Sequence, residues 1–236
     1  MSVLEAFQGL QEIHFIARFG KKLDVSSNIR HGATLKTLIV ETNRCGPSKT
    51  EAQCINAGDL SLIAASCPKL EQLALPLYSI NPEDEDAPDY DIIGPRPGHP
   101  HVRTELEAAL DAIASMENLH TLRISDATSY TSERTMPKTP KQQAEWRYAF
   151  QARAHGVIQY LAARSSGVKV LGFSPVVKIL AFKVPDQIGH FWPHYFCTRG
   201  TTRDVLGAVT TVARPLQDWK VDFPASIVLQ GYHEDW

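Results

Sequence analysis

Apolar residues recur along the chain in one phrase, a leucine or valine followed by apolar residues three and five positions later. Good copies begin at Leu35, Leu70 and Leu119, and weaker copies begin at Leu10 and Val168. Because successive side chains of a strand point to opposite faces, the last two apolar residues of each copy share one face of a short strand. The pattern therefore predicts five short strands, each with one face buried in a core.

Helical periodicity precedes several of these strands. Residues 60–64 and 106–116 carry apolar side chains at helical spacing. Asp59 is expected to cap the first helix, and Thr104 with Glu107 three residues later has the spacing of a capping box at the second. A strand-plus-helix unit that cannot bury its own apolar face is typical of a solenoid, in which strands joined by helical crossovers pair in parallel.

Two of the phrases resemble a known family. The sequence LKTLIVETNRC, residues 35–45, resembles a leucine-rich repeat, with Asn43 at the asparagine position and Cys45 at the last apolar position. The sequence SCPKLEQLAL, residues 66–75, is similar to the Cys-Pro-x-Leu form in the repeat regions of F-box proteins, especially fungal ones. The resemblance covers residues 10–173. It implies a leucine-rich-repeat α/β solenoid and a substrate-receptor role in ubiquitin ligation, although an F-box itself is not visible in the sequence.

The repeats are irregular in length. Their first apolar residues stand 25, 35, 49 and 49 positions apart, against about 20–29 residues in leucine-rich repeats. The excess lies mostly in two polar, proline-rich inserts near 76–102 and 126–141, which we expect to be loops. The alternative is an ordinary α/β domain in which leucines recur by chance.

The chain changes character after the repeats. We assign residues 1–175 to the solenoid and residues 176–236 to a β-rich C-terminal cap of the same domain, whose aromatic residues cover the last repeat. Within the cap, residues 194–199 and 205–213 are expected to pair as a hairpin across a polar turn at 200–204.

Composition and charge narrow the function classes. The chain has 236 residues, of which 43% are hydrophobic, and a formal net charge of −2. These values suit a soluble domain and argue against nucleic acid as the main partner. A basic-then-apolar leader is absent, and so is any run of about 18 apolar residues, which argues against a membrane partner. Four widely spaced cysteines favour a reducing compartment, so the protein is expected in the cytoplasm or the nucleus.

The sequence carries no strong catalytic signature. Residues 46–50 lack the spacing of a phosphate-binding loop, and residues 172–176 lack the last glycine of a nucleophile elbow. The best metal candidate, His190, His194 and Cys197, supplies three donors, whereas a structural zinc site needs four. We therefore expect no metal, no cofactor and no enzymatic activity, and a metal-dependent enzyme is the least favoured alternative.

The favoured function is protein binding through the solvent face of the sheet, by a partner of unknown identity. Short polar and charged side chains on a rigid curved sheet suit a polar protein surface. The runner-up is a scaffold or structural fragment without a ligase link. The first strand, near Ile13 and Phe15, is expected to be an uncapped edge that self-associates unless an upstream domain covers it. The residues expected on the binding face are Glu12, His14, Thr37, Ile39, Glu41, Gln72, Ala74, Thr121, Arg123 and Ser125.

Overall fold

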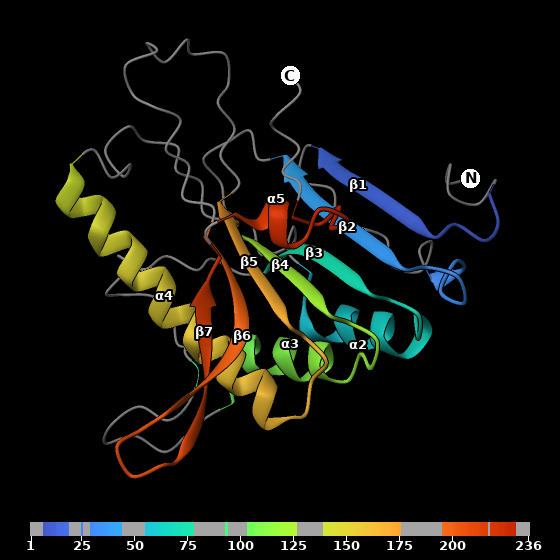
Figure 1. Ribbon diagram of the computed structural model, residues 1–236. Coiled ribbons are helices and arrows are strands. Elements are labelled where there is room, and N and C mark those ends of the chain that lie inside the picture. Colours follow the sequence, from blue (N-terminus) through green and yellow to red (C-terminus); the bar gives the residue numbers. More distant parts are fainter. Residues whose placement is uncertain are drawn as a thin grey trace.

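The computed structural model describes residues 7–18, 25, 29–43, 55–77, 93, 103–126, 139–175, 195–216 and 218–229. The acidic part of the first predicted insert and most of the second lie outside these residues. The elements in chain order are β1 (Glu12–Arg18), β2 (Thr37–Asn43), α2 (Ala57–Ser66), β3 (Gln72–Leu77), α3 (Glu105–Ala114), β4 (Thr121–Asp126), α4 (Pro140–Ala163), β5 (Val170–Pro175), β6 (Tyr195–Arg203), β7 (Val209–Pro215) and α5 (Trp219–Asp222) (Figure 1).

All seven strands form one sheet in chain order, from β1 to β7. The first five are parallel, and β6 and β7 continue the sheet in antiparallel pairing. The register aligns equivalent leucines of the repeated phrase, since Leu38 pairs with Leu73 and Leu73 with Leu122. The five strands and their parallel pairing, as predicted from the phrase, are thereby confirmed, and the fold is an open α/β sheet.

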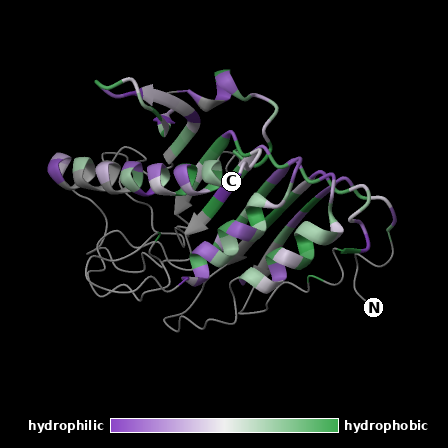
Figure 2. Ribbon diagram, turned by 90° about the horizontal axis from the view of Figure 1, so that it is seen from below, coloured by the Kyte–Doolittle hydropathy of each residue, from purple (hydrophilic) through white to green (hydrophobic). Residues whose placement is uncertain are grey.

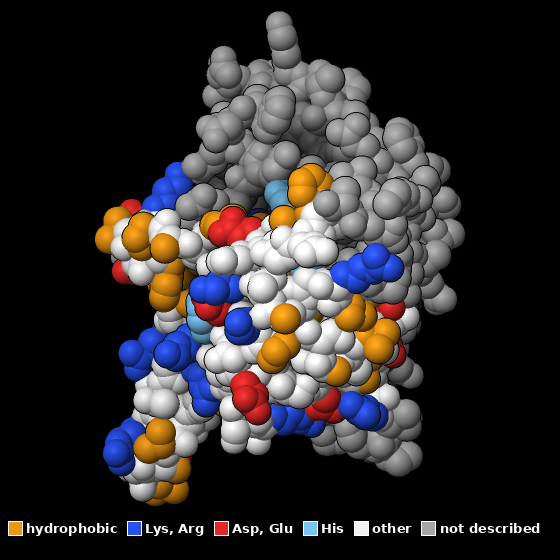
Figure 3. All heavy atoms as spheres, turned by 90° about the vertical axis from the view of Figure 1, so that its right-hand side faces the viewer, with side chains coloured by type: hydrophobic (Ala, Val, Ile, Leu, Met, Phe, Trp, Pro, Cys, Tyr) orange, Lys and Arg blue, Asp and Glu red, His pale blue; other side chains and the backbone are white. Residues whose placement is uncertain are grey.

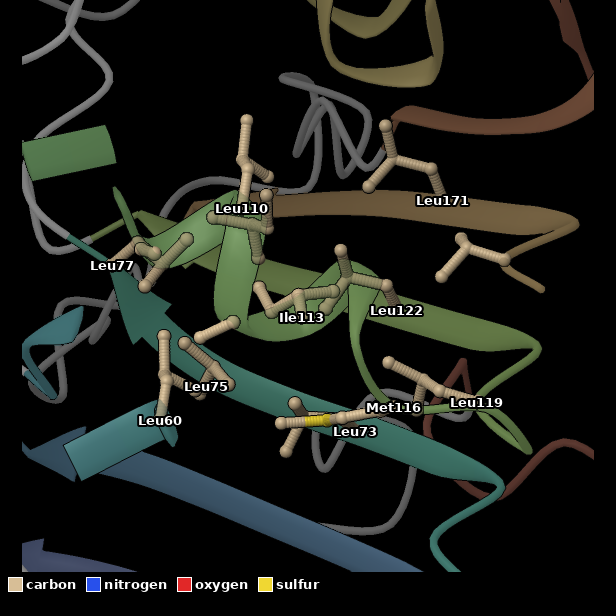
Figure 4. Close-up of a cluster of buried hydrophobic side chains, with 14 of the residues drawn as sticks. Leu60, Leu73, Leu75, Leu77, Leu110, Ile113, Met116, Leu119, Leu122 and Leu171 are labelled. Carbon is tan, nitrogen blue, oxygen red and sulfur yellow. The ribbon is translucent and has the colours of Figure 1, made fainter. Parts of the chain in front are cut away.

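Helices α2, α3 and α4 cover one face of the sheet, and α5 lies on the other (Figures 1 and 2). The main core lies between the three long helices and the strands. Leu73 of β3 and Leu122 of β4 meet Leu60 of α2 and Ile113 of α3 there, and all four are fully buried (Figure 4). Removal of this apolar surface from water is the main driving force for folding.

Local hydrogen bonds fix where the helices begin. Thr104 and Glu107 form the predicted capping box of α3, with the Thr104 hydroxyl 3.1 Å from the Glu107 N–H and the Glu107 carboxylate 3.0 Å from the Thr104 N–H. The cap of α2 is Asn56 rather than Asp59. Asp59 is instead the third helical residue of a second capping box, in which its carboxylate accepts from the Asn56 N–H. The prediction that Asp59 is the N-cap was therefore wrong. Both Asn56 and Asp59 have side-chain oxygens that can accept from a helix N-terminus, and the sequence did not show which of the two comes first in the capping box.

The predicted hairpin is present, but its turn lies at residues 204–208 instead of 200–204. Gly200 is within β6, opposite Val212 of β7. The turn is set by Asp204, whose carboxylate accepts from the N–H groups of Leu206 and Ala208 at 2.8 and 2.9 Å. Gly207 follows with a φ of +86°, a conformation that favours glycine. An aspartate with a glycine three residues later therefore defines this turn, and the polar run before it continues the strand.

None of the described helices has the length and apolar character needed to cross a membrane.

Candidate interaction surface

The predicted binding face is largely buried. Glu12 and His14 of β1 are exposed, and Gln72 of β3 is half-buried. The side chains of Glu41 and Ser125 lie outside the described residues. The expectation of solvent exposure is wrong for the other five predicted residues, each no more than 4% exposed, namely Thr37, Ile39, Ala74, Thr121 and Arg123.

The cover over this face is the C-terminal segment, residues 218–229, which includes α5 (Figure 1). Val228 is fully buried against Ile39 of β2 and Ala74 of β3. Leu229 forms a second cluster with Val170 of β5 and with Phe196. The cap therefore extends beyond the last repeat to the central strands, where it removes the apolar side chains of Ile39 and Ala74 from water.

Gln72 fastens this segment to the sheet. Its amide oxygen accepts from the Ser226 hydroxyl at 3.1 Å and from the Val228 N–H at 3.4 Å. A half-buried glutamine thus satisfies backbone and side-chain donors of the segment, which would be costly to bury without partners. A free ligand would have to displace these contacts to reach the middle of the face.

Polar side chains reach solvent along the rim where the parallel strands begin. Lys36, Glu71, His120 and Lys169, here called the rim row, each stand directly before a strand. The Glu71 N–H donates to the Lys36 carbonyl at 2.8 Å, the His120 N–H to the Glu71 carbonyl at 3.0 Å, and the Lys169 N–H to the His120 carbonyl at 2.9 Å. One rim residue per unit is therefore held at the same height across four neighbouring strands, about 4.8 Å apart.

The turns that lead into the strands have equivalent geometry. The Leu70 N–H donates to the Cys67 carbonyl and the Leu119 N–H to the Met116 carbonyl, both at 3.1 Å. The Asn118 side chain links two successive turns by donating to the Pro68 carbonyl at 2.7 Å. This stacking of one turn on the next keeps the rim row straight.

Weak ion pairs link Glu71 to Lys36 and to His120 within the rim row. Lys36 Nζ lies 3.6 Å from one carboxylate oxygen of Glu71, and His120 Nε2 lies 3.9 Å from the other. These side chains are 40–48% exposed, so water screens the pairs and each contributes little to stability. Glu71 balances one of the two lysines, which leaves the row basic. Figure 3, a view from the side of β1, shows basic and acidic side chains dispersed over a largely polar surface.

Alternation along the strands predicted which residues lie on the face opposite the helices, but it did not predict the rim row. A signal for the row is present in the sequence, since the residue directly after the first apolar position of each good copy is polar: Lys36, Glu71 and His120. Alternation alone assigns this position to the core side. The structure instead places it at the rim, where the side chain reaches water.

The described residues contain no group of three or more metal-binding side chains. Of the candidate metal ligands, His190 and His194 lie outside the described residues. The Cys197 thiol is fully buried, 3.5 Å from the Leu171 carbonyl oxygen, and burial raises its pKa to about 12. A thiol with so high a pKa is protonated at neutral pH and is a poor nucleophile.

Comparison of the chain with protein-family models, with curated proteins and with solved structures gives no match. The function must therefore be inferred from the fold and from the exposed surface.

Proposed function

We propose that this protein is a non-enzymatic protein-binding module of the leucine-rich-repeat solenoid type, and that its rim row contacts the partner. The observation that carries the proposal is the rim row itself. Four successive units present a polar or charged side chain that reaches solvent at one equivalent position, on a rigid line of stacked turns. Binding sites on such rigid elements hold their geometry without an ordering cost.

The strand order supports the solenoid. Parallel strands that follow each other in both the sequence and the sheet, with α2, α3 and α4 all on one face, are what stacked strand-plus-helix units produce. Equivalent apolar positions are buried in successive units, as Leu35, Leu70 and Leu119 illustrate. Repeat proteins commonly bind through exposed positions that recur once per unit.

The charge of the rim row indicates the chemistry of the partner. The row holds two lysines and a histidine against a single glutamate, so a protein surface with acidic side chains is favoured. The Cys-Pro-x-Leu phrase extends the proposal to a substrate-receptor role in ubiquitin ligation. Cys67 in that phrase is buried and free, as is Cys197, which suits a protein of the cytoplasm or nucleus.

Affinity capture from a cell extract with matched charge variants tests this function. The test variant, Lys36→Glu with Lys169→Glu, reverses two charges of the rim row. The control variant, Lys141→Glu with Lys220→Glu, reverses two exposed charges on α4 and α5. Mass spectrometry of each captured set then reports which partners depend on the rim row.

We expect a defined partner that the wild type and the control capture and that the rim-row variant loses, because reversed charges repel an acidic surface. Subunits of a ubiquitin ligase in that set would support the receptor role. An identical set of partners for the wild type and the rim-row variant would contradict the assignment of the rim row.

A further inference from the structure

The two edge strands of the sheet, β7 and β1, differ in what lies beside their outer backbone groups. At one end, helix α4 lies along the edge strand β7. Gln151 donates to the Ala213 carbonyl at 2.8 Å and Gln159 donates to the Thr211 carbonyl at 3.3 Å. Two glutamine side chains thus occupy carbonyl groups that an additional strand would need, and the edge of β7 is blunted.

The opposite end is β1, which pairs with β2 through seven register positions. The Thr37 N–H donates to the Gln11 carbonyl at 3.0 Å, so in a regular ladder residues 13 and 15 also bond toward β2. The backbone groups of residues 12, 14, 16 and 18 then point away from the sheet. Within the described part of the chain, no strand pairs with this outer edge, which is a template for another strand.

The sequence of β1 is self-complementary when it is read in opposite directions. It begins with glutamate, Glu12, ends with arginine, Arg18, and has Phe15 at its centre. An antiparallel pair centred on Phe15 places each end of one strand opposite the other end of its neighbour. We propose that the outer edge of β1 binds β1 of a second copy of this chain, around a twofold axis at Phe15, so that the two sheets become continuous.

Backbone geometry and side-chain chemistry select the same register. Pairing centred on Phe15 sets position 14 opposite position 16 and position 12 opposite position 18 of the second copy. These are the positions whose N–H and C=O groups point outward, so each pair exchanges hydrogen bonds. Glu12 then stands opposite Arg18 of the second copy, twice by symmetry.

Pairing in a neighbouring register does not place Glu12 opposite Arg18 of the second copy. Centring the pair on His14 sets Glu12 opposite an isoleucine, and centring it on Ile16 leaves Glu12 beyond the pairing. The selected register also continues the core, because Ile13 is buried and Phe15 packs against the main cluster on the same side of the sheet. Since the β7 edge is blunted, pairing at β1 ends with two copies and not with a fibre.

Sedimentation equilibrium of the full chain tests this inference, which does not depend on the proposed function. We expect a dimer at micromolar concentration. Glu12→Arg alone, or Arg18→Glu alone, sets like charges opposite each other at both ends of the pair and should weaken the dimer about tenfold. The double variant, Glu12→Arg with Arg18→Glu, restores opposite charges and should restore the dimer.

Circular dichroism of each variant, matched to the wild type, confirms that the fold is kept. A monomeric wild type would overturn the inference. A dimer that neither single variant weakens, or that the double variant fails to restore, would overturn the register and the twofold axis at Phe15.

Discussion

Asp111 of α3 ties helix α3 to helix α4 through a compact polar contact. Its carboxylate accepts from the Tyr160 hydroxyl at 3.0 Å and pairs with Arg164 and Arg103. The Arg164 guanidinium lies over the Tyr160 ring, 3.4 Å from its centre, in a cation–π geometry. Burial by itself would raise the pKa of Asp111, but the hydrogen bonds from Tyr160, Arg164 and Arg103 outweigh it and lower that pKa below its ordinary value.

This lowered pKa predicts a pH-dependent contribution to stability. The ionised carboxylate stabilises the folded chain above the pKa of an unfolded aspartate, about 3.9. The contribution is lost as the pH falls through the lower pKa of the folded state. Asp111→Asn should therefore cost about 1 kcal/mol at neutral pH, and less near pH 3, below the pKa of an unfolded aspartate.

Urea unfolding of the wild type and of Asp111→Asn at the two pH values measures this difference. Asp222→Asn, which removes an exposed carboxylate at the end of α5, is a matched control for loss of a carboxylate. A stability gap for Asp111→Asn that is equally large at both pH values would contradict the role assigned to the ionised carboxylate.

Single residues of the core could be predicted from the sequence, and residues of the opposite face could not. Leu38, Leu73 and Leu122 were expected to be buried because the repeated phrase places them on one side of a strand. Thr37 and Arg123 were expected to reach water by the same alternation, yet both are buried. Ile39 and Ala74 of the same face are packed against Val228, more than 150 positions away in sequence, and the Ser226 hydroxyl donates to the Gln72 amide oxygen across a separation of 154 residues. Local periodicity carries no information about such contacts.

Elements were easier to predict than their connections. The strand phrases and the helical periodicity gave β1 to β5, α2 and α3, because burial of one face imposes a period on the sequence. The hairpin of β6 and β7 was expected from β-rich runs, but its turn was displaced because the geometry of Asp204 and Gly207 outweighs the general polarity of residues 200–204. The hydrogen bonds from Gln151 and Gln159 to β7 could not be predicted, because each joins residues more than 50 positions apart and no local sequence pattern marks them.

The C-terminal segment provides a prediction at the scale of elements. Val228→Ala removes two methyl groups from the contact with Ile39 and Ala74. We expect amide exchange of Val228 and Leu229 to become faster, because the Val228 cluster holds the segment on the sheet together with the Leu229 cluster and the Gln72 hydrogen bonds, and the substitution weakens the first of these contacts. Hydrogen–deuterium exchange with mass spectrometry measures the change.

Val221→Ala is the matched control, since Val221 in the short helix α5 is 73% exposed. It should leave exchange of the segment unchanged. If Val228→Ala also leaves exchange unchanged, the segment is not held on the sheet by the cluster that Val228 forms, and our description of the cover would be wrong.

At the scale of the molecule, the sheet presents different surfaces to solvent. The helices cover one face, the C-terminal segment covers much of the other, and the rim row stays accessible where the strands begin. The order and direction of the parallel strands could be predicted because a crossover was expected between successive repeated phrases. Which surface stays free could not, because it depends on where the last part of the chain folds back.

The central claim is that the rim row is where the protein meets its partner, and lysine footprinting tests it most directly. The chain is treated with an amine-reactive reagent with and without the captured partner, and the labelling rate of each lysine is measured. We predict that the partner slows labelling of Lys36 and Lys169 several-fold and leaves Lys141 and Lys220 unchanged, because only the first two lie in the rim row. Unchanged labelling of Lys36 and Lys169, with protection at Lys141 or Lys220 instead, would contradict the claim.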